Sequence, residues 1–297
     1  MMLFLLVLIL IGHASSEQSQ QPPINIFILA GQSNMAGRGG VVSNTKTGIT
    51  TWDGIVPPQC QSNPSILRLS ADLKWVLARE PLHADIDATK TNGIGPGMSF
   101  ANAILTKDNG FGFVGLVPCA IGGTNISQWE KGGVLYEQLV RRTEAAVQSG
   151  GKVKALLWYQ GESDTITRED AEMYEGRLKK FFTDVRSDLQ SPLLPIFQVA
   201  LASGQGPYMD IVREAQLGIN LVNLRSVDAK GLPLEPDGLH LTTQAQIVLG
   251  EMLANAYLQS PPSPVHASSP SKSGANRVIS FDFLSCLLVC VLLRSLM

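Results

Sequence analysis

Short apolar runs alternate along the chain with segments in which apolar residues recur every three or four positions. Three of the runs end at glycine, namely at Gly31, at the Gly122–Gly123 pair and at Gly161. Continuous apolar runs of this length are typical of strands buried on both faces of a parallel sheet. The strands predicted in this way cover residues 24–30, 113–120, 153–159, 194–202 and 221–227.

Helical spacing lies between these runs, at residues 135–146, 171–185, 211–219 and 245–256. Thr167 with Asp170 three residues later resembles a capping box, which places the start of the second helix there. The alternation predicts a single α/β domain over residues 22–259, a three-layer α/β/α sandwich with a mostly parallel central sheet. Residues 41–91 lack the alternation, and we interpret them as a long excursion beside the functional site.

The two ends of the chain have patterns of their own. The apolar run from Leu3 to Ile11, followed by small residues, is typical of a secretory signal peptide over residues 1–16. Residues 260–275 are rich in Pro and Ser and predict a flexible stalk. Residues 276–297 end in an apolar tail that is typical of a GPI-anchor signal and shorter than the roughly twenty residues of a membrane span.

These end segments predict a secreted, extracellular protein that is either released or attached to the plasma membrane through a lipid anchor. N-terminal sequencing of the mature chain and its release by a phospholipase would check this. The net charge of −2 and an aromatic content of 6% give no basic or base-stacking surface for nucleic acid. We therefore expect a small or neutral partner.

The number and spacing of the cysteines and histidines indicate whether a disulfide or a metal site is expected. Cys60 and Cys119 could form a disulfide in an oxidising compartment, or they could be two buried thiols. The other two cysteines, Cys286 and Cys290, lie in the apolar tail. No Cys/His cluster has the spacing of a zinc site, and we expect no metal and no cofactor.

Residues 31–37, directly after the first apolar run, place Ser33 on a tight turn flanked by glycines. Such a turn can expose the hydroxyl at the edge of the sheet, with the backbone N–H at a helix start that favours an oxyanion. Met35 stands where a Gly-x-Ser-x-Gly elbow has its second glycine, and the Lys-Ser/Thr pair of a phosphate loop is missing. Taken alone, this motif is better explained by Ser33 as a helix N-cap.

Two of the four histidines can serve the domain, because His13 lies in the signal peptide and His266 in the stalk. His240 follows Asp237 by three residues, in a turn before the last predicted helix. A carboxylate in that position can orient an imidazole and stabilise its charged form, although Asp237 could also be only an N-cap. His83 is expected to pack in the domain or to bind substrate.

Residues 31–35 and 237–240 are similar to the first and last blocks of the SGNH/GDSL-type hydrolases. More narrowly, the chain resembles the carbohydrate acetylesterases related to sialate O-acetylesterase, including the plant proteins of that family. The intervening segments that agree are 95–98, 122–126 and 158–164. The resemblance covers about residues 25–257 and implies a serine esterase that hydrolyses O-acetyl groups of carbohydrates.

The resemblance also implies roles for particular residues. It implies a triad of Ser33, Asp237 and His240. It implies an oxyanion hole made by the N–H of Ser33, a glycine of the 122–123 turn, which we take to be Gly123, and the side chain of Gln160. General SGNH enzymes have an asparagine in the block where this chain offers Gln160.

Some assignments stay open at this point. Glu162, near the end of a predicted central strand, could orient His240 instead of Asp237 or together with it, or it could be a structural carboxylate. Arg38 could contact a sugar or pair with a carboxylate, and Asn125 lies in a loop expected to line the pocket. The alternatives for function are a catalytically silent carbohydrate-binding protein on the same fold and a general GDSL-type acyl esterase.

Overall fold

The computed structural model describes residues 23–44 and 46–260. The predicted signal peptide, the hydrophobic tail and all of the stalk except Ser260 lie outside the described residues, so these assignments stay predictions. Among the described residues, no helix is long and apolar enough to cross a membrane.

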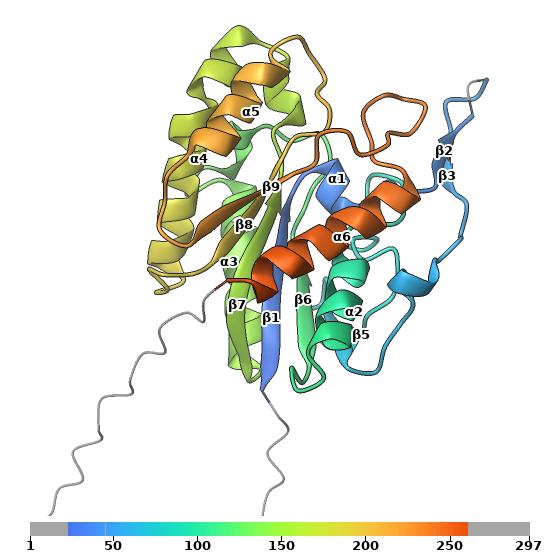
Figure 1. Ribbon diagram of the computed structural model, residues 1–297, viewed down its shortest axis with the longest axis vertical. Coiled ribbons are helices and arrows are strands. Elements are labelled where there is room, and N and C mark those ends of the chain that lie inside the picture. The colour runs from blue at the N-terminus through green and yellow to red at the C-terminus, as the bar shows by residue number, and fades with distance from the viewer. Residues whose placement is uncertain (1–22, 45, 261–297) are drawn as a thin grey trace, which may run out of the picture. The chain divides into compact units, whose positions relative to one another are not determined.

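A seven-stranded sheet forms the centre of the domain (Figure 1). The strand order is β5-β4-β6-β1-β7-β8-β9, and every neighbouring pair is parallel except β4 with β5. The strands are β1 (Ile24–Gly31), β4 (Ile66–Leu69), β5 (Trp75–Leu77), β6 (Val114–Pro118), β7 (Gly151–Tyr159), β8 (Ile196–Ala200) and β9 (Leu224–Asp228). All five predicted strands are present, and β1 lies at the centre between β6 and β7.

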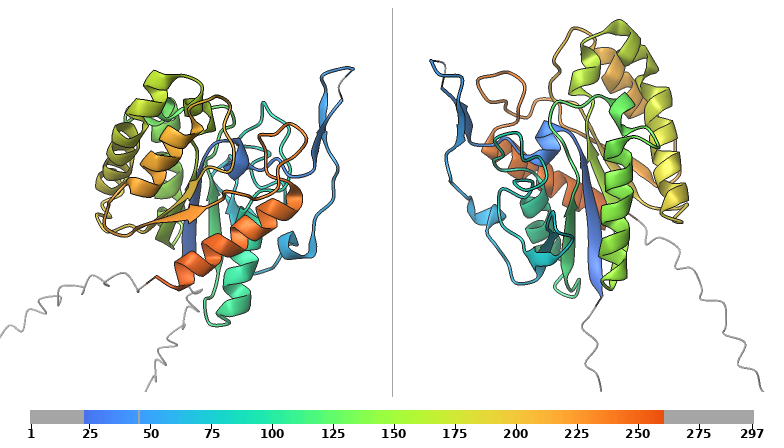
Figure 2. Two further views of the ribbon diagram at one scale, coloured as in Figure 1. Left: turned by 45° about the horizontal axis from the view of Figure 1, so that its top comes forward. Right: turned by 180° about the vertical axis from the view of Figure 1, so that it is seen from behind.

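Helices cover both faces of this sheet (Figures 1 and 2). On one face α2 (Gly97–Lys107) packs against α6 (Thr243–Leu258), and on the other face α3 (Val134–Gln148) lies beside α4 (Arg168–Asp188). Helix α5 (Met209–Gly218) packs against α4. The predicted three-layer α/β/α sandwich with a mostly parallel sheet is thus confirmed. The Thr167 hydroxyl accepts a hydrogen bond from the Asp170 N–H at 3.1 Å and caps α4.

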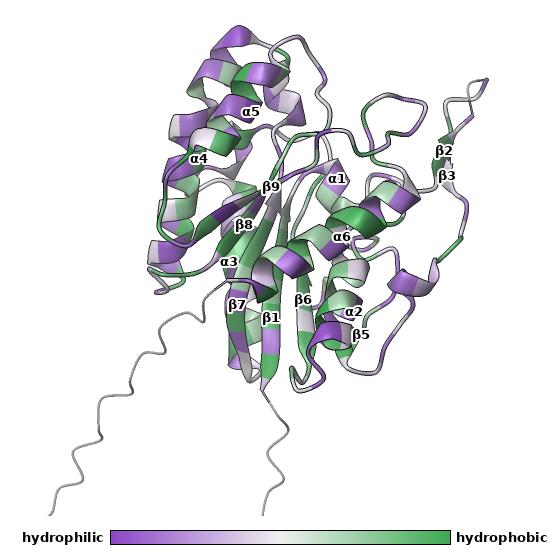
Figure 3. Ribbon diagram, viewed as in Figure 1, coloured by the Kyte–Doolittle hydropathy of each residue, from purple (hydrophilic) through white to green (hydrophobic). Residues whose placement is uncertain are grey.

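Aromatic side chains fill the space between the sheet and the helices. Phe27 of β1 packs edge-on against Tyr257 of α6, with ring centroids 5.0 Å apart. On the other face Trp158 of β7 packs against Phe181 of α4 at 4.5 Å. The central strands are coloured hydrophobic and the outer sides of α4 and α5 hydrophilic in Figure 3. Burial of both faces explains why these strands are continuous apolar runs in the sequence.

The segment from Val41 to Thr91 contains structure that the sequence analysis missed. Strands β2 (Val41–Ser43) and β3 (Thr50–Trp52) form a hairpin that projects from the domain, and β4 and β5 extend the edge of the sheet (Figure 1). Strands of three or four residues are too short to show a period. Helix α2 was also missed, because it is buried on most of its sides and therefore has no polar stripe.

Cys60 and Cys119 are both buried and free. Of the two alternatives for this pair, the structure therefore has two separate thiols. Burial raises the pKa of both thiols, that of Cys119 to about 11. Because the thiolate is the reactive form, neither cysteine is a candidate nucleophile at neutral pH.

Candidate active site

The turn that carries Ser33 follows directly from β1. Gly31 has a φ of +127°, and a Cβ at this position would lie 2.0 Å from the Tyr159 carbonyl oxygen of β7. Only glycine fits there, so the chain can leave the sheet and begin the single-turn helix α1 (Ser33–Ala36) at once. Ser33 is 5% exposed at the carboxyl edge of the central strands.

The loop before α6 brings His240 to this turn. The Nε2 atom of His240 lies 2.9 Å from Ser33 Oγ, and its Nδ1 atom lies 2.6 Å from an oxygen of Asp237. The other oxygen of Asp237 accepts the N–H groups of Leu239 at 2.9 Å and of His240 at 3.0 Å. The structure therefore joins Ser33, His240 and Asp237 in one hydrogen-bonded series.

The Asp237 carboxylate is held in its charged form. Partial burial opposes its ionisation, but the two backbone N–H donors and the imidazole outweigh burial and keep the pKa below its usual range. An ionised carboxylate on Nδ1 fixes the tautomer in which Nε2 can accept a proton from Ser33.

Glu162, the alternative acid, has a different partner. It is fully buried, and one of its oxygens accepts a hydrogen bond from the Asn34 side-chain amide at 2.7 Å. Within the described part of the chain it forms no hydrogen bond to His240. Burial raises the pKa of Glu162 to about 7, against the opposing effect of the Asn34 amide. The geometry therefore favours Asp237 over Glu162 as the partner of His240.

The raised pKa of Glu162 predicts a pH-dependent stability. A group with a raised pKa in the folded state stabilises the fold fully below its unfolded pKa, and this stability is lost as the pH rises through the folded value of about 7. Glu162→Gln removes the ionisation. We expect the free energy of unfolding to fall less in Glu162→Gln than in the wild type between pH 5 and pH 8.5, by about 3 kcal/mol. Urea denaturation at the two pH values measures this difference, and equal falls would contradict the prediction.

The position of Gln160 does not support its predicted role as an oxyanion donor. Its side chain is fully buried, and its amide nitrogen lies 2.6 Å from an oxygen of Asp164, 2.8 Å from the Thr124 carbonyl and 3.1 Å from the Gln32 side-chain oxygen. An amide nitrogen has two hydrogens, so these protein acceptors occupy both. Gln160 instead ties the end of β7 to the Ser33 turn and to the loop after β6.

The glycine turn after β6 approaches the serine at Gly122. A Cβ at Gly122 would lie 3.4 Å from the Cβ of Ser33, and the Gly122 N–H donates to Asp87 at 3.3 Å. Gly123 is exposed with a φ of +76°. Among the described residues, neither the Ser33 N–H nor the Gly123 N–H has a hydrogen-bond acceptor. These two donors are therefore free to bind a ligand.

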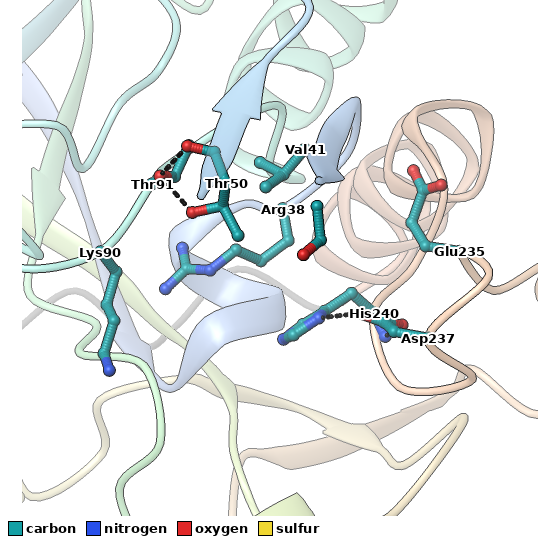
Figure 4. A pocket seen from close by; sticks show the side chains of 9 residues that line it. Arg38, Val41, Thr50, Lys90, Thr91, Glu235, Asp237 and His240 are labelled. Atoms are coloured by element: carbon teal, nitrogen blue, oxygen red, sulfur yellow. Dashed lines mark hydrogen bonds and ion pairs between the residues drawn. The ribbon is translucent and has the colours of Figure 1, made fainter. Parts of the chain in front are cut away.

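A hollow of about 180 Å³ opens beside His240 (Figure 4). Its walls come from the β2–β3 hairpin, the loop before Asn92 and the loop that carries His240. The lining residues are Arg38, Val41, Ser43, Thr50, Lys90, Thr91, Glu235, Asp237 and His240. The hollow thus combines hydroxyl groups and charged groups next to the imidazole.

The other predicted residues have mainly local partners. Arg38 is buried and pairs with the Asp87 carboxylate and with the Asn92 side chain at 2.9 Å, although it also lines the hollow. Asn125 precedes the 3-10 helix η2 (Ile126–Trp129) and accepts a hydrogen bond from the Ser127 hydroxyl at 2.8 Å. It is not among the residues that line the described hollow. His83 is buried, and burial lowers its pKa to about 3, so it is neutral.

The described residues contain no group of three or more His, Cys, Asp or Glu side chains that could hold a metal ion. The sequence analysis missed Asn34, Asp87 and Asp164, which support the site from buried positions. Asn34 directly follows Ser33, so its place in the motif was the signal that could have identified it.

A doubly covered parallel sheet with Ser, His and Asp joined at its carboxyl edge is an arrangement found in α/β ester hydrolases. Residues 23–259 match the family described as "Carbohydrate esterase, sialic acid-specific acetylesterase". The chain belongs to this family. It is a carbohydrate esterase, and thus a carboxylic ester hydrolase.

Known proteins agree with this placement. The chain is 57% identical over 242 residues to a "Probable carbohydrate esterase At4g34215" of Arabidopsis thaliana, covering 81% of this chain and 93% of that protein. The crystal structure of the Arabidopsis protein superimposes with a TM-score of 0.77, over 80% of this chain and 98% of that one. The crystal structure of NanS, at 18% identity and a TM-score of 0.63, covers 80% of this chain and 97% of NanS and shares the fold.

Proposed function

We propose that this protein releases acetate from O-acetylated carbohydrates, with Ser33 as nucleophile, His240 as general base and Asp237 as the group that orients the base. The observation that carries the proposal is the hydrogen-bonded series of 2.9 Å and 2.6 Å that joins these side chains. It lies in a chain that belongs to a carbohydrate esterase family.

The reaction proceeds in two acyl-transfer steps. Ser33 Oγ attacks the acetyl carbonyl carbon while its proton moves to His240 Nε2. The bond from that carbon to the sugar oxygen then breaks, and His240 returns the proton to the sugar oxygen. A water molecule attacks the acetyl-Ser33 ester with His240 again as base, so that acetate leaves and Ser33 regains its proton. The Asp237 carboxylate stabilises the imidazolium in both steps.

The free N–H groups of Ser33 and Gly123 support a stabilising site for the oxyanion that forms in each step. The Ser33 N–H lies at the start of α1, and the Gly123 N–H lies in the turn whose preceding glycine contacts Ser33. Backbone donors of this kind accelerate a reaction because they stabilise the negative charge that develops on the carbonyl oxygen in the transition state. Gln160 is not part of this set, because its amide hydrogens are occupied.

The size and lining of the hollow support an acetyl group on a sugar as substrate. A volume of about 180 Å³ is small, and the Ser43, Thr50 and Thr91 side chains offer hydroxyl groups to a polar ligand. The name of the Arabidopsis relative, a probable carbohydrate esterase, agrees with a sugar substrate. A long acyl chain is expected to exceed a hollow of this size, which favours the short acetyl group.

The test compares the purified domain, residues 22–259, on p-nitrophenyl acetate, p-nitrophenyl decanoate and an O-acetylated polysaccharide. We expect acetate release from the polysaccharide and a kcat/KM for the acetyl ester at least about 100-fold above that for the decanoyl ester. Equal rates on both esters would indicate a general acyl esterase. A folded domain that hydrolyses none of the three substrates would indicate a carbohydrate-binding protein.

A further inference from the structure

We propose that Asn34 is a positioning residue that holds the His240 loop in place against the Ser33 turn, and that Glu162 fixes the orientation of the Asn34 amide. The inference rests on the proposed function, because it assigns the group that keeps the Ser33–His240 pair assembled. Asn34 directly follows Ser33 in the chain, and its contacts define the role.

The Asn34 side chain forms hydrogen bonds to the residues on both sides of His240. Its side-chain oxygen accepts the Leu241 N–H at 2.9 Å, and its side-chain nitrogen lies 3.3 Å from the Leu239 carbonyl oxygen. Leu239 and Leu241 are the two neighbours of His240 in the chain. One amide, attached to the residue that follows the nucleophile, therefore fixes the backbone on either side of the base.

Two other hydrogen bonds join this part of the chain to the Ser33 segment, but neither holds a neighbour of His240. The Gly40 N–H donates to the Glu235 carboxylate at 3.2 Å, and the Gln246 side-chain amide donates to the Asn34 carbonyl at 3.0 Å. The Glu235 N–H donates to the His240 carbonyl at 2.6 Å, and the Thr242 N–H donates to the Pro233 carbonyl at 3.1 Å. These last two bonds join the loop to itself. Ser33 and His240 are 207 positions apart in the chain, so their 2.9 Å contact depends on how the two segments are held together. A displacement of about 1 Å in such a pair can cost 10²-fold in rate.

The chemistry of the contacts allows only one orientation of the Asn34 amide. The Leu239 carbonyl can only accept and the Leu241 N–H can only donate, so a flipped amide would lose both bonds. Glu162 adds a third constraint, because its carboxylate accepts from the same amide nitrogen at 2.7 Å. Asn34 and Glu162 are both fully buried, so a mismatched pair in their place would have no water to compensate it.

The test uses Asn34→Ala and Asn34→Asp in the full chain. The aspartate has the same shape and keeps the acceptor for Leu241, but it cannot donate to Leu239 or to Glu162. We expect kcat on p-nitrophenyl acetate to fall about 100-fold in both variants, with KM changed by less than about threefold, because Asn34 does not line the hollow. The rate at which an organophosphonate inactivates Ser33 should fall by the same factor as kcat.

The matched control is Ser203→Ala. Ser203 lies in the loop after β8, and its hydroxyl donates to the same Leu239 carbonyl at 2.5 Å, without any link to the Ser33 turn. We expect kcat of Ser203→Ala to stay within about threefold of the wild type. The double variant N34D/E162Q exchanges amide and carboxylate, so it re-forms the bond between the two positions and should recover part of the kcat lost in Asn34→Asp.

A melting curve for each variant separates positioning from folding, since a merely structural role lowers the melting temperature but leaves the rate per folded molecule unchanged. The proposal is overturned if folded Asn34→Ala and Asn34→Asp keep kcat within threefold, or if Ser203→Ala loses as much as they do. Should Asn34→Ala not fold, the isosteric Asn34→Asp and N34D/E162Q decide. Failure of the proposed function is a separate result, since either the wild type would hydrolyse no ester or Ser33→Ala would keep wild-type activity.

Discussion

Ser33→Ala is expected to lower kcat for acetate release by about 10⁶-fold, the loss typical of removing a triad nucleophile. Without Oγ there is no acetyl-enzyme, and only direct attack by water remains. The N–H donors of Ser33 and Gly123 stay in place, so a residual rate above the uncatalysed reaction should persist. Single-turnover assays with acetylated polysaccharide and p-nitrophenyl acetate measure both quantities.

The same experiment has an internal consistency check. Because Ser33 and His240 act as one unit, the double variant Ser33→Ala/His240→Ala should be no slower than Ser33→Ala by more than about tenfold. Ser163→Ala serves as the control serine, because Ser163 lies close to the Ser33 turn, 3.5 Å from the Gln32 amide, and should be neutral. If Ser33→Ala keeps more than a hundredth of the wild-type kcat, the nucleophile is another group.

The parts of the fold that the sequence predicted are those in which burial leaves a regular pattern. Strand β1 is hidden on both faces and reads as an apolar run, and helix α4 has one buried face and a Thr167 cap. Strands β4 and β5 and helix α2 left no such pattern. The first two are three or four residues long, and α2 is buried on most of its sides.

The residues of the site likewise divide into those that the sequence could predict and those that it could not. Asp237 and His240 are three residues apart, so a local turn is enough to bring them together, and the sequence could show it. The role of Gln160 depended on which acceptors surround the end of β7, and the buried carboxylate of Asp164 is one of them. The role of Asn34 depended on its contacts with a loop more than two hundred residues away in the chain. Neither environment leaves a periodic signal in the sequence, and the only local signal was the place of Asn34 directly after Ser33.

Asp237→Asn is expected to lower kcat by about 10⁴-fold while the structure stays intact. The new amide would donate a hydrogen bond to Nδ1 of His240, and this favours the tautomer with its proton on Nε2. That proton would face Ser33 Oγ, 2.9 Å away, where the base must instead accept one. The stabilisation of the imidazolium by a negative charge is lost as well. The loss should appear in kcat on p-nitrophenyl acetate, with the melting temperature close to that of the wild type.

Glu162→Gln is the matched variant for this prediction, because it also replaces a carboxylate near the site with an amide of the same shape. The oxygen of a glutamine can still accept from the Asn34 amide, so Asn34 keeps its orientation and kcat should fall by less than about tenfold. The opposite outcome, a 10⁴-fold loss in Glu162→Gln with a small effect of Asp237→Asn, would make Glu162 the acid that serves His240. That outcome would require a movement of His240 away from the 2.6 Å contact with Asp237 during the reaction.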